Sequence, residues 1–151
     1  MARAAAGLSA RDFAEIANLY ARYNLCSDMG DPAEYADCFM PDGVLRVRGL
    51  TLRDGTMVRG DGEFVVKGRA ELVAFKRRDQ ASRGGKYRRH WNGSLHLERG
   101  DGDSVRGRCY LQAYNGEPGS LPVLAQTGVY EDTIVEVDGE WKFALRALTV
   151  D

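Results

Sequence analysis

The sequence has little cysteine, little histidine and no long apolar run. Its three cysteines, Cys26, Cys38 and Cys109, are far apart and form no Cys-x-x-Cys pair. This argues against a disulfide framework and a zinc ribbon, and it favours a reducing, cytoplasmic location. No apolar stretch approaches the roughly 20 residues of a membrane span. The segment Ala2–Ala6 is too short and too weakly apolar for a signal peptide.

An excess of charge of either sign is also missing. The 21 basic and 22 acidic residues give a net charge of −1, so we expect neither a nucleic acid nor a membrane as a partner. The basic clusters 76–78 and 86–89 are flanked by acids and are predicted to be solvated faces.

Only two histidines are present, His90 and His96. Six residues along an extended strand span roughly 20 Å, so the two imidazoles cannot share a metal ion. No glycine-rich loop stands in the strand–turn–helix context that cradles a phosphate. We therefore expect neither a metal nor a cofactor.

The residues that are present predict one α+β domain over 1–151. The length is close to the commonest domain size, and 44% hydrophobic residues can form an ordinary core. Ser9 is a good helix N-cap, and Asp31 followed by Pro32 begins a second helix. The predicted helices are 9–30, 31 to about 39, and 68–82, with Pro41-Asp42-Gly43 as a turn.

Strands dominate the rest of the chain. Strands are predicted at 44–50, 87–99, 104–114, 123–137 and 141–150, and the less regular segment 51–67 contains hairpin-like turns at Asp54-Gly55 and Asp61-Gly62. Long strands joined by tight turns indicate a curled antiparallel meander. Helices followed by a meander predict an α+β fold with the helices on one face of the sheet.

His90 is the obvious general base if the protein is an enzyme, because a neutral imidazole accepts a proton near pH 7. Strand alternation predicts that His90, Asn92, Ser94 and His96 share one face, and that Trp91, Leu95 and Leu97 share the other. The polar face either meets solvent or lines a pocket. The apolar face is expected to pack on a helix or to form a subunit interface, which would give a homo-dimer or homo-trimer.

Several motifs occur in an order that resembles a known family. They are Ile16-x-x-Leu19-Tyr20-x-x-Tyr23, Asp28-x-Gly30-Asp31, Ala36-x-x-Phe39-x-x-Asp42-Gly43, Lys67-Gly68-Arg69, Arg89-His90 and Asp138-Gly139-x-Trp141-x-Phe143. Together they resemble the SnoaL-like group of the nuclear-transport-factor-2-like superfamily, which includes scytalone dehydratase, hexachlorocyclohexane dehydrochlorinase and bile acid dehydratases. The resemblance implies a cone-shaped, curved antiparallel sheet with three helices from the N-terminal half packed on it.

The same resemblance implies a site. Its catalytic residues would be His90 as base, Asp28 as the partner of that base, and Tyr23 and Arg146 as helpers that polarise a carbonyl or assist a leaving group. The expected pocket lining is Phe39, Leu45, Phe75, Asn92, Tyr110 and Tyr130. From the residues alone, other roles stay open: Asp28 as a helix-end charge, Tyr23 as core packing, and Arg146 as a surface charge.

The resulting hypothesis is a cofactor-independent lyase, a dehydratase or an enzyme that eliminates HX from a small, mostly apolar molecule. An isomerase or an epoxide hydrolase on the same cone is one alternative, with Asn92 and Arg146 as candidates for positioning water. The other is a non-catalytic module that binds a small ligand.

Overall fold

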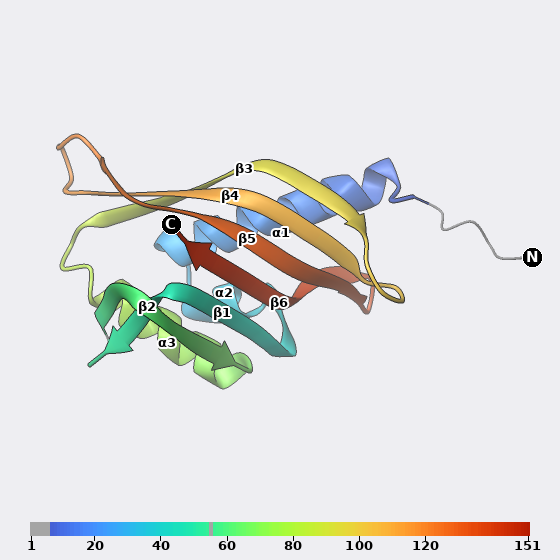
Figure 1. Ribbon diagram of the computed structural model, residues 1–151, viewed down its shortest axis with the longest axis horizontal. Helices are drawn as coiled ribbons and strands as arrows, with labels where there is room; N and C mark the ends of the chain where they lie inside the picture. Colours follow the sequence, from blue (N-terminus) through green and yellow to red (C-terminus); the bar gives the residue numbers. More distant parts are fainter. Residues whose placement is uncertain (1–6, 55) are drawn as a thin grey trace, which may run out of the picture.

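A computed structural model describes residues 7–54 and 56–151, so Ala2–Ala6 and the predicted turn residue Gly55 lie outside the described residues. Three helices and six strands are formed within this part of the chain (Figure 1). The helices are α1 (Ala10–Met29), α2 (Pro32–Ala36) and α3 (Arg69–Ala81). The strands are β1 (Phe39–Arg53), β2 (Thr56–Lys67), β3 (Tyr87–Arg99), β4 (Val105–Gly116), β5 (Val123–Val137) and β6 (Glu140–Val150).

The predicted helix ends are confirmed, except at the end of α2. Ser9 and Asp12 form a complete capping box at the start of α1, and Gly30 follows its last residue. The Asp31 carboxylate accepts a hydrogen bond from the N–H of Ala33 at the start of α2. The prediction that α2 continues to Phe39 is wrong, because buried Phe39 already pairs with β6.

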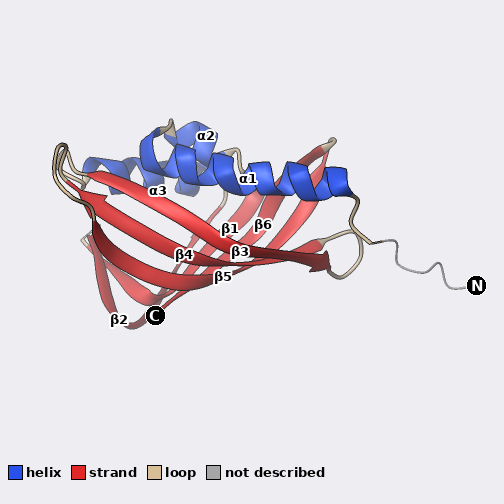
Figure 2. Cartoon of the chain, turned by 90° about the horizontal axis from the view of Figure 1, so that it is seen from above, coloured by secondary structure: helices blue, strands red, loops and turns tan. Residues whose placement is uncertain are grey.

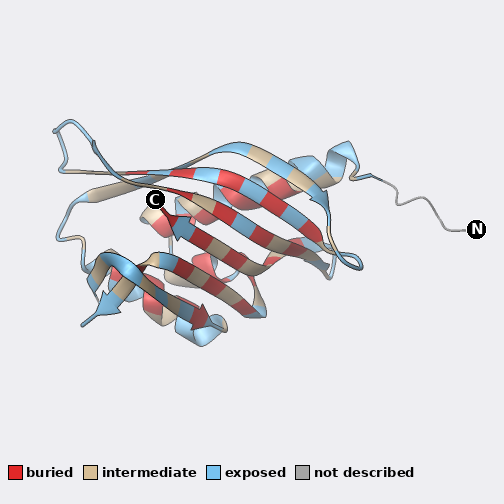
Figure 3. Ribbon diagram, in the orientation of Figure 1, coloured by how far each residue is buried: buried red, intermediate tan, exposed pale blue. Residues whose placement is uncertain are grey.

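The strands form one sheet in the order β2-β1-β6-β5-β4-β3. It curves beneath the helices, which lie on one side of it (Figure 2). The expected α+β fold is confirmed, with one correction to the antiparallel sheet, since β1 and β6 run parallel while every other pair is antiparallel. β1 and β6 are far apart in the chain and are not joined by a hairpin, so no tight turn imposes an antiparallel arrangement on them. Buried and exposed residues alternate along the central strands, so the core lies between the helices and the concave face (Figure 3).

Two predicted turns lie inside strands instead. Residues 41–43 belong to β1, where the pairing with β6 is irregular between Phe39 and Val44. Gly62 belongs to β2, opposite the irregularity between Arg48 and Leu50. A Cβ at Gly62 would lie 1.8 Å from the Cγ2 atom of Thr51, so this glycine permits a close approach of two strands rather than a turn.

A bulge in β3 changes which residues face the core. The pairing with β4 shifts between Gly93 and His96, and Ser94 has a φ of 56°. Leu95 and Leu97 therefore pack against the core on the same side as His90, and the prediction that they share a face with Trp91 is wrong. Trp91 stays on the outer side with 64% of its surface exposed.

No helix within residues 7–54 and 56–151 is long and apolar enough to cross a membrane.

Candidate active site

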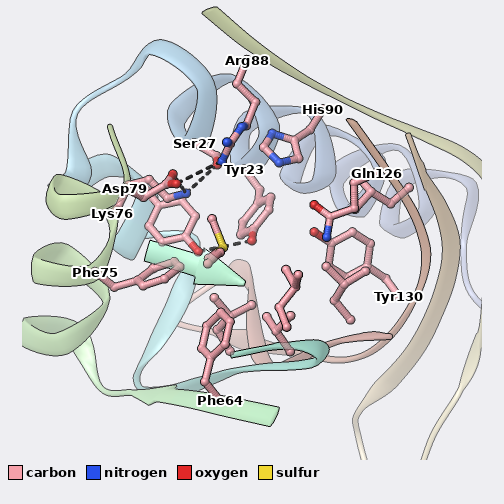
Figure 4. A pocket seen from close by; sticks show the side chains of 17 residues that line it. Tyr23, Ser27, Phe64, Phe75, Lys76, Asp79, Arg88, His90, Gln126 and Tyr130 are labelled. Carbon is pink, nitrogen blue, oxygen red and sulfur yellow. Dashed lines mark hydrogen bonds and ion pairs between the residues drawn. The ribbon is translucent and has the colours of Figure 1, made fainter. Parts of the chain in front are cut away.

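A small cavity of about 50 Å³ lies between the helices and the concave face of the sheet (Figure 4). Its walls are apolar on the side of β1 and β2, where Leu45, Val47 and Phe64 line it, and polar towards α3 and the start of β3. A neighbouring hollow of about 230 Å³ shares four lining residues with the cavity, namely Met57, Phe75, Asp79 and Arg88. The mouth of the cavity therefore lies between the β1–β2 hairpin and the end of α3.

The structure brings His90 and Asp28 together at the wall of this cavity. His90 Nδ1 is hydrogen-bonded to Asp28 Oδ1, and the backbone N–H of His90 donates to Asp28 Oδ2 at 2.8 Å. The two side chains are only 15% and 5% exposed. A carboxylate can only accept, so Nδ1 carries the proton and Nε2 is left with a free lone pair. Figure 4 shows the ring of His90 pointing into the cavity.

Asp28 is held in place by residues from the end of α3. The Arg83 guanidinium donates to the backbone oxygens of Asp28 at 2.7 Å and Ser27 at 2.9 Å, and the Gln80 amide donates to Gly30 O at 3.0 Å. These donors satisfy the free carbonyls at the end of α1. The positive charge of Arg83 also offsets the unfavourable interaction between a carboxylate and a helix C-terminus.

The electrostatic surroundings favour the neutral form of His90. Burial lowers the pKa of His90 below its usual value, and Asp28 opposes this by favouring the protonated ring. The positive charges of Lys76 and Arg88 lower the pKa further. The neutral imidazole therefore persists to lower pH than that of a solvent-exposed histidine.

A buried ionic cluster also lines the cavity, and the sequence analysis missed it. Lys76 Nζ donates to Ser27 Oγ at 2.8 Å and to Asp79 Oδ2 at 3.0 Å. Arg83 and Arg88 donate to the Asp79 carboxylate at 2.7 and 3.0 Å. The prediction that Lys76 and Arg88 lie on solvated faces is therefore wrong. The helical spacing of Leu72, Lys76 and Asp79 could have revealed an inward-facing stripe, because residues four and seven apart share a helix face.

Tyr23 and Arg146, the two predicted helpers, occupy different places. Tyr23 lines the cavity, and its hydroxyl lies 3.2 Å from that of Tyr35. Arg146 is completely buried behind the rings of Tyr23 and Tyr130, with its guanidinium carbon 4.0 and 3.8 Å from their centres. It lies in the core and not at the cavity surface, so the expectation that it touches a substrate does not fit the structure.

The charge of Arg146 is balanced inside the core. Its Nε lies 3.6 Å from Asp132 Oδ2, which also accepts a hydrogen bond from the Tyr20 hydroxyl at 2.7 Å. Burial raises the pKa of Asp132 to about 6, although Arg146 opposes this shift. The apolar residues near Arg146 in the sequence therefore reflect its burial in the core, where it pairs with Asp132.

Only some of the residues predicted to line the pocket lie at the cavity. Leu45, Phe75 and Tyr130 line the cavity. Phe39 does not; it packs in the core against Tyr23 and Phe143. The prediction for Tyr110 is wrong, since alternation along β4 turns it outward with 59% of its surface exposed.

Asn92 lies outside the cavity, and several residues that do line it were not predicted. Asn92 lies in a surface groove between α1 and β3, where its amide oxygen accepts from Asn24 at 2.9 Å. Besides the ionic cluster and the apolar wall from β1 and β2, the lining residues that the sequence did not predict include Tyr35 and Gln126. Gln126 follows a loop at the start of a long strand, and nothing in the local pattern marks it as inward-facing.

The described residues contain no group of three or more His, Cys, Asp or Glu side chains that could hold a metal ion. The three cysteines are free and buried. Burial raises the pKa of each thiol, so none is activated as a nucleophile.

Comparisons with solved structures agree on the fold. A Catenulispora acidiphila protein, solved in complex with S-DNPA, is 26% identical with a TM-score of 0.75, and the match covers 95% of this chain and 96% of that chain. Aln2 from a Streptomyces species is 22% identical with a TM-score of 0.80, over 95% and 94% of the two chains. An NTF2-like protein with a cystatin-like fold from Novosphingobium aromaticivorans is 21% identical with a TM-score of 0.71, over 93% and 82%.

Among curated proteins, no significant match was found. A family model described as the SnoaL-like domain matches residues 9–147, which includes all three helices and most of the sheet. On the strength of that match, the chain belongs to the SnoaL-like domain family.

Proposed function

We propose that the protein is a cofactor-independent lyase that eliminates water or HX from a small, mostly apolar carbonyl compound. The observation that carries the proposal is the buried His90–Asp28 pair, which leaves His90 Nε2 as the free proton acceptor at the cavity wall. The solved Catenulispora acidiphila relative in complex with S-DNPA supports a small molecule as the ligand.

The elimination uses the base twice. His90 Nε2 removes a proton from the carbon next to the carbonyl group, and the electron pair of that C–H bond forms the new double bond. The bond from the β-carbon to the leaving hydroxyl breaks, and the imidazolium returns its proton to the departing hydroxide. Water leaves and His90 is neutral again. Asp28 keeps its hydrogen bond to Nδ1 and stabilises the imidazolium.

Other residues shape the pocket. Leu45, Phe75 and Tyr130 offer apolar surface to the substrate. Tyr23 and Tyr35 share one hydrogen bond between their hydroxyls, which leaves the second O–H of the pair as a donor for the leaving group. We assign Arg146 a positioning role, because its guanidinium supports the rings of Tyr23 and Tyr130 from behind. The groove position of Asn92 gives no support to an epoxide hydrolase in which Asn92 positions water.

The proposal is tested with a panel of β-hydroxy and β-halo ketones that includes β-hydroxytetralone, whose dehydration yields fluorescent naphthol. The wild-type protein is expected to release products lighter by the mass of water or HX, followed by mass spectrometry. Products of unchanged mass would assign an isomerase instead. A panel recovered entirely unchanged would contradict the proposal and favour a ligand-binding module.

Replacing Asp28 by asparagine is expected to lower kcat by about 10²- to 10³-fold with little change in the fold. The asparagine oxygen can still accept from the His90 backbone N–H. Its NH₂ group then faces Nδ1 and moves the ring proton to Nε2, where the base is needed. The matched control is Asp31→Asn at the start of α2, which is expected to retain activity. Full activity in Asp28→Asn would show that Asp28 only supports the structure.

The pH profile of kcat/KM gives a further prediction. Activity requires neutral His90, so kcat/KM should rise with pH and reach a plateau. Since burial lowers the pKa of His90, the midpoint is expected below the ordinary histidine value of about 6.5. Removing the Asp28 charge takes away the main opposing influence, so Asp28→Asn should move the midpoint lower still. A midpoint above the ordinary value in the wild type would contradict the buried-base assignment.

A further inference from the structure

Positive charge exceeds negative charge at the polar end of the cavity. Three basic side chains lie here, those of Lys76, Arg83 and Arg88. Only two carboxylates, those of Asp28 and Asp79, balance them. Lys76, Arg83 and both carboxylates are more than nine-tenths buried. A buried excess of charge is costly unless something of opposite charge offsets it, so this end of the cavity suits an anionic group.

Lys76 is the cation best placed to meet a ligand. An ammonium group has three N–H donors, and the described residues supply two oxygen acceptors, Ser27 Oγ and Asp79 Oδ2. The ring of Tyr35 lies 4.6 Å from Nζ. Arg88 is less suited to bind a ligand, because its guanidinium already donates to Asp79 and to the amide oxygen of Asn115, at 3.0 Å each.

The cavity also offers an unused neutral donor. Gln126 Nε2 is buried and has no hydrogen-bond partner among the described residues. Figure 4 shows Lys76 and Asp79 across the cavity from Gln126 and Tyr130, with His90 between the two groups. The N–H donors of Lys76 and Gln126 thus lie on either side of His90. They suit a ligand with oxygen acceptors, because a buried donor left unpaired costs free energy.

We propose that Lys76 is a further catalytic residue: its ammonium group binds the carbonyl oxygen of the substrate and stabilises the enolate formed when His90 removes the proton. This inference rests on the proposed function, because an enolate forms only if His90 acts as a base. As the C–H electron pair moves into the carbonyl system, negative charge gathers on the oxygen held by Lys76, where a fixed cation in a dry site stabilises it. When the leaving group departs, the oxygen becomes a neutral carbonyl again, and Lys76 keeps its protons throughout.

The test uses para-nitrophenol, because its phenolate mimics an enolate oxygen and absorbs visible light. The wild-type protein is expected to bind the phenolate at least about tenfold more tightly than the neutral phenol, which lowers the apparent pKa of the bound phenol by about one unit. Lys76→Met is expected to abolish this preference. Arg77→Met removes the same charge from the exposed side of α3 and is expected to leave it unchanged.

Two results would overturn the inference: a wild-type protein with no preference for phenolate, or an undiminished preference in folded Lys76→Met. The wild-type measurement stands even if Lys76→Met fails to fold. His90→Gln separates this inference from the proposed function, since it should still bind phenolate through Lys76 while losing turnover. Turnover that survives in His90→Gln would refute the base, whatever the phenolate titration shows.

Discussion

His90→Gln is expected to lower kcat for elimination by about 10²- to 10⁴-fold while the protein remains folded. Glutamine fills a similar volume and keeps the backbone N–H that binds Asp28, but its amide cannot accept a proton near neutral pH. The only other histidine, His96, lies beyond the bulge on the outer side of β3. No imidazole from the described residues can therefore replace His90 at the cavity.

The measurement compares initial rates of product formation for the two proteins, with circular dichroism and thermal unfolding as checks of the fold. The control is His96→Gln, which makes the same substitution on an exposed position of the same strand and should leave the rate unchanged. Equal rates for His90→Gln and the wild type would remove His90 from the mechanism.

The largest expected effect on stability comes from Arg146→Met, which should lower the free energy of unfolding by about 3–5 kcal/mol. The methionine fills part of the space between the rings of Tyr23 and Tyr130 but removes the charge that faces Asp132. Asp132 is then a buried carboxyl supported mainly by the Tyr20 hydroxyl. Such a group must either stay charged in the core or take up a proton.

Denaturant unfolding measures this loss, and its pH dependence identifies the cause. A carboxyl whose pKa is raised in the folded state binds a proton there before it does in the unfolded chain, so the folded state gains stability as the pH falls. Arg146 lowers the pKa of Asp132, so removing it raises that pKa further. The variant then gains more stability than the wild type as the pH falls from about 8 to about 5, and the loss in Arg146→Met shrinks over that range.

The matched control is Arg108→Met on β4. Arg108 pairs with Glu131 at 2.8 Å, but both side chains are exposed, so the change is expected to cost only about 0–1 kcal/mol. Adding Asp132→Leu to Arg146→Met should recover much of the lost stability, because a buried ion pair can be replaced by apolar side chains. A cost for Arg146→Met no greater than that of the control would show that the buried pair contributes little.

The sequence was most informative where structure depends on neighbouring residues. The caps at Ser9 and Asp31 fixed the starts of α1 and α2, and alternation with flanking turns gave the bounds of β3 and β5 as observed. The contact between Asp28 and His90 joins α1 to β3. It could be expected only from the resemblance to a family, because no local pattern specifies a distance between residues so far apart in the chain.

The errors have local physical causes. The bulge at Ser94 interrupts the two-residue period of β3, and from there onward alternation predicts the wrong face. Lys76 was missed because charge normally indicates solvent, whereas here Asp79, Arg83 and Arg88 compensate one another in the interior. Arg146 was expected at the substrate because of the family resemblance. Its burial among four aromatic rings from α1, β5 and β6 is visible only in the assembled core.

The parallel pairing of β1 with β6 also governs when the cavity can form during folding. Leu45 lies opposite Arg146, so these strands meet across roughly 100 residues of chain, and contacts of such separation form slowly. The hairpin-linked strands β3 to β6 can assemble from near neighbours. We expect docking of the β1–β2 hairpin onto β6 to be the closing step, which brings the apolar wall at Leu45 to the half that carries His90. A nascent chain would therefore lack a complete cavity until β6 has been synthesised.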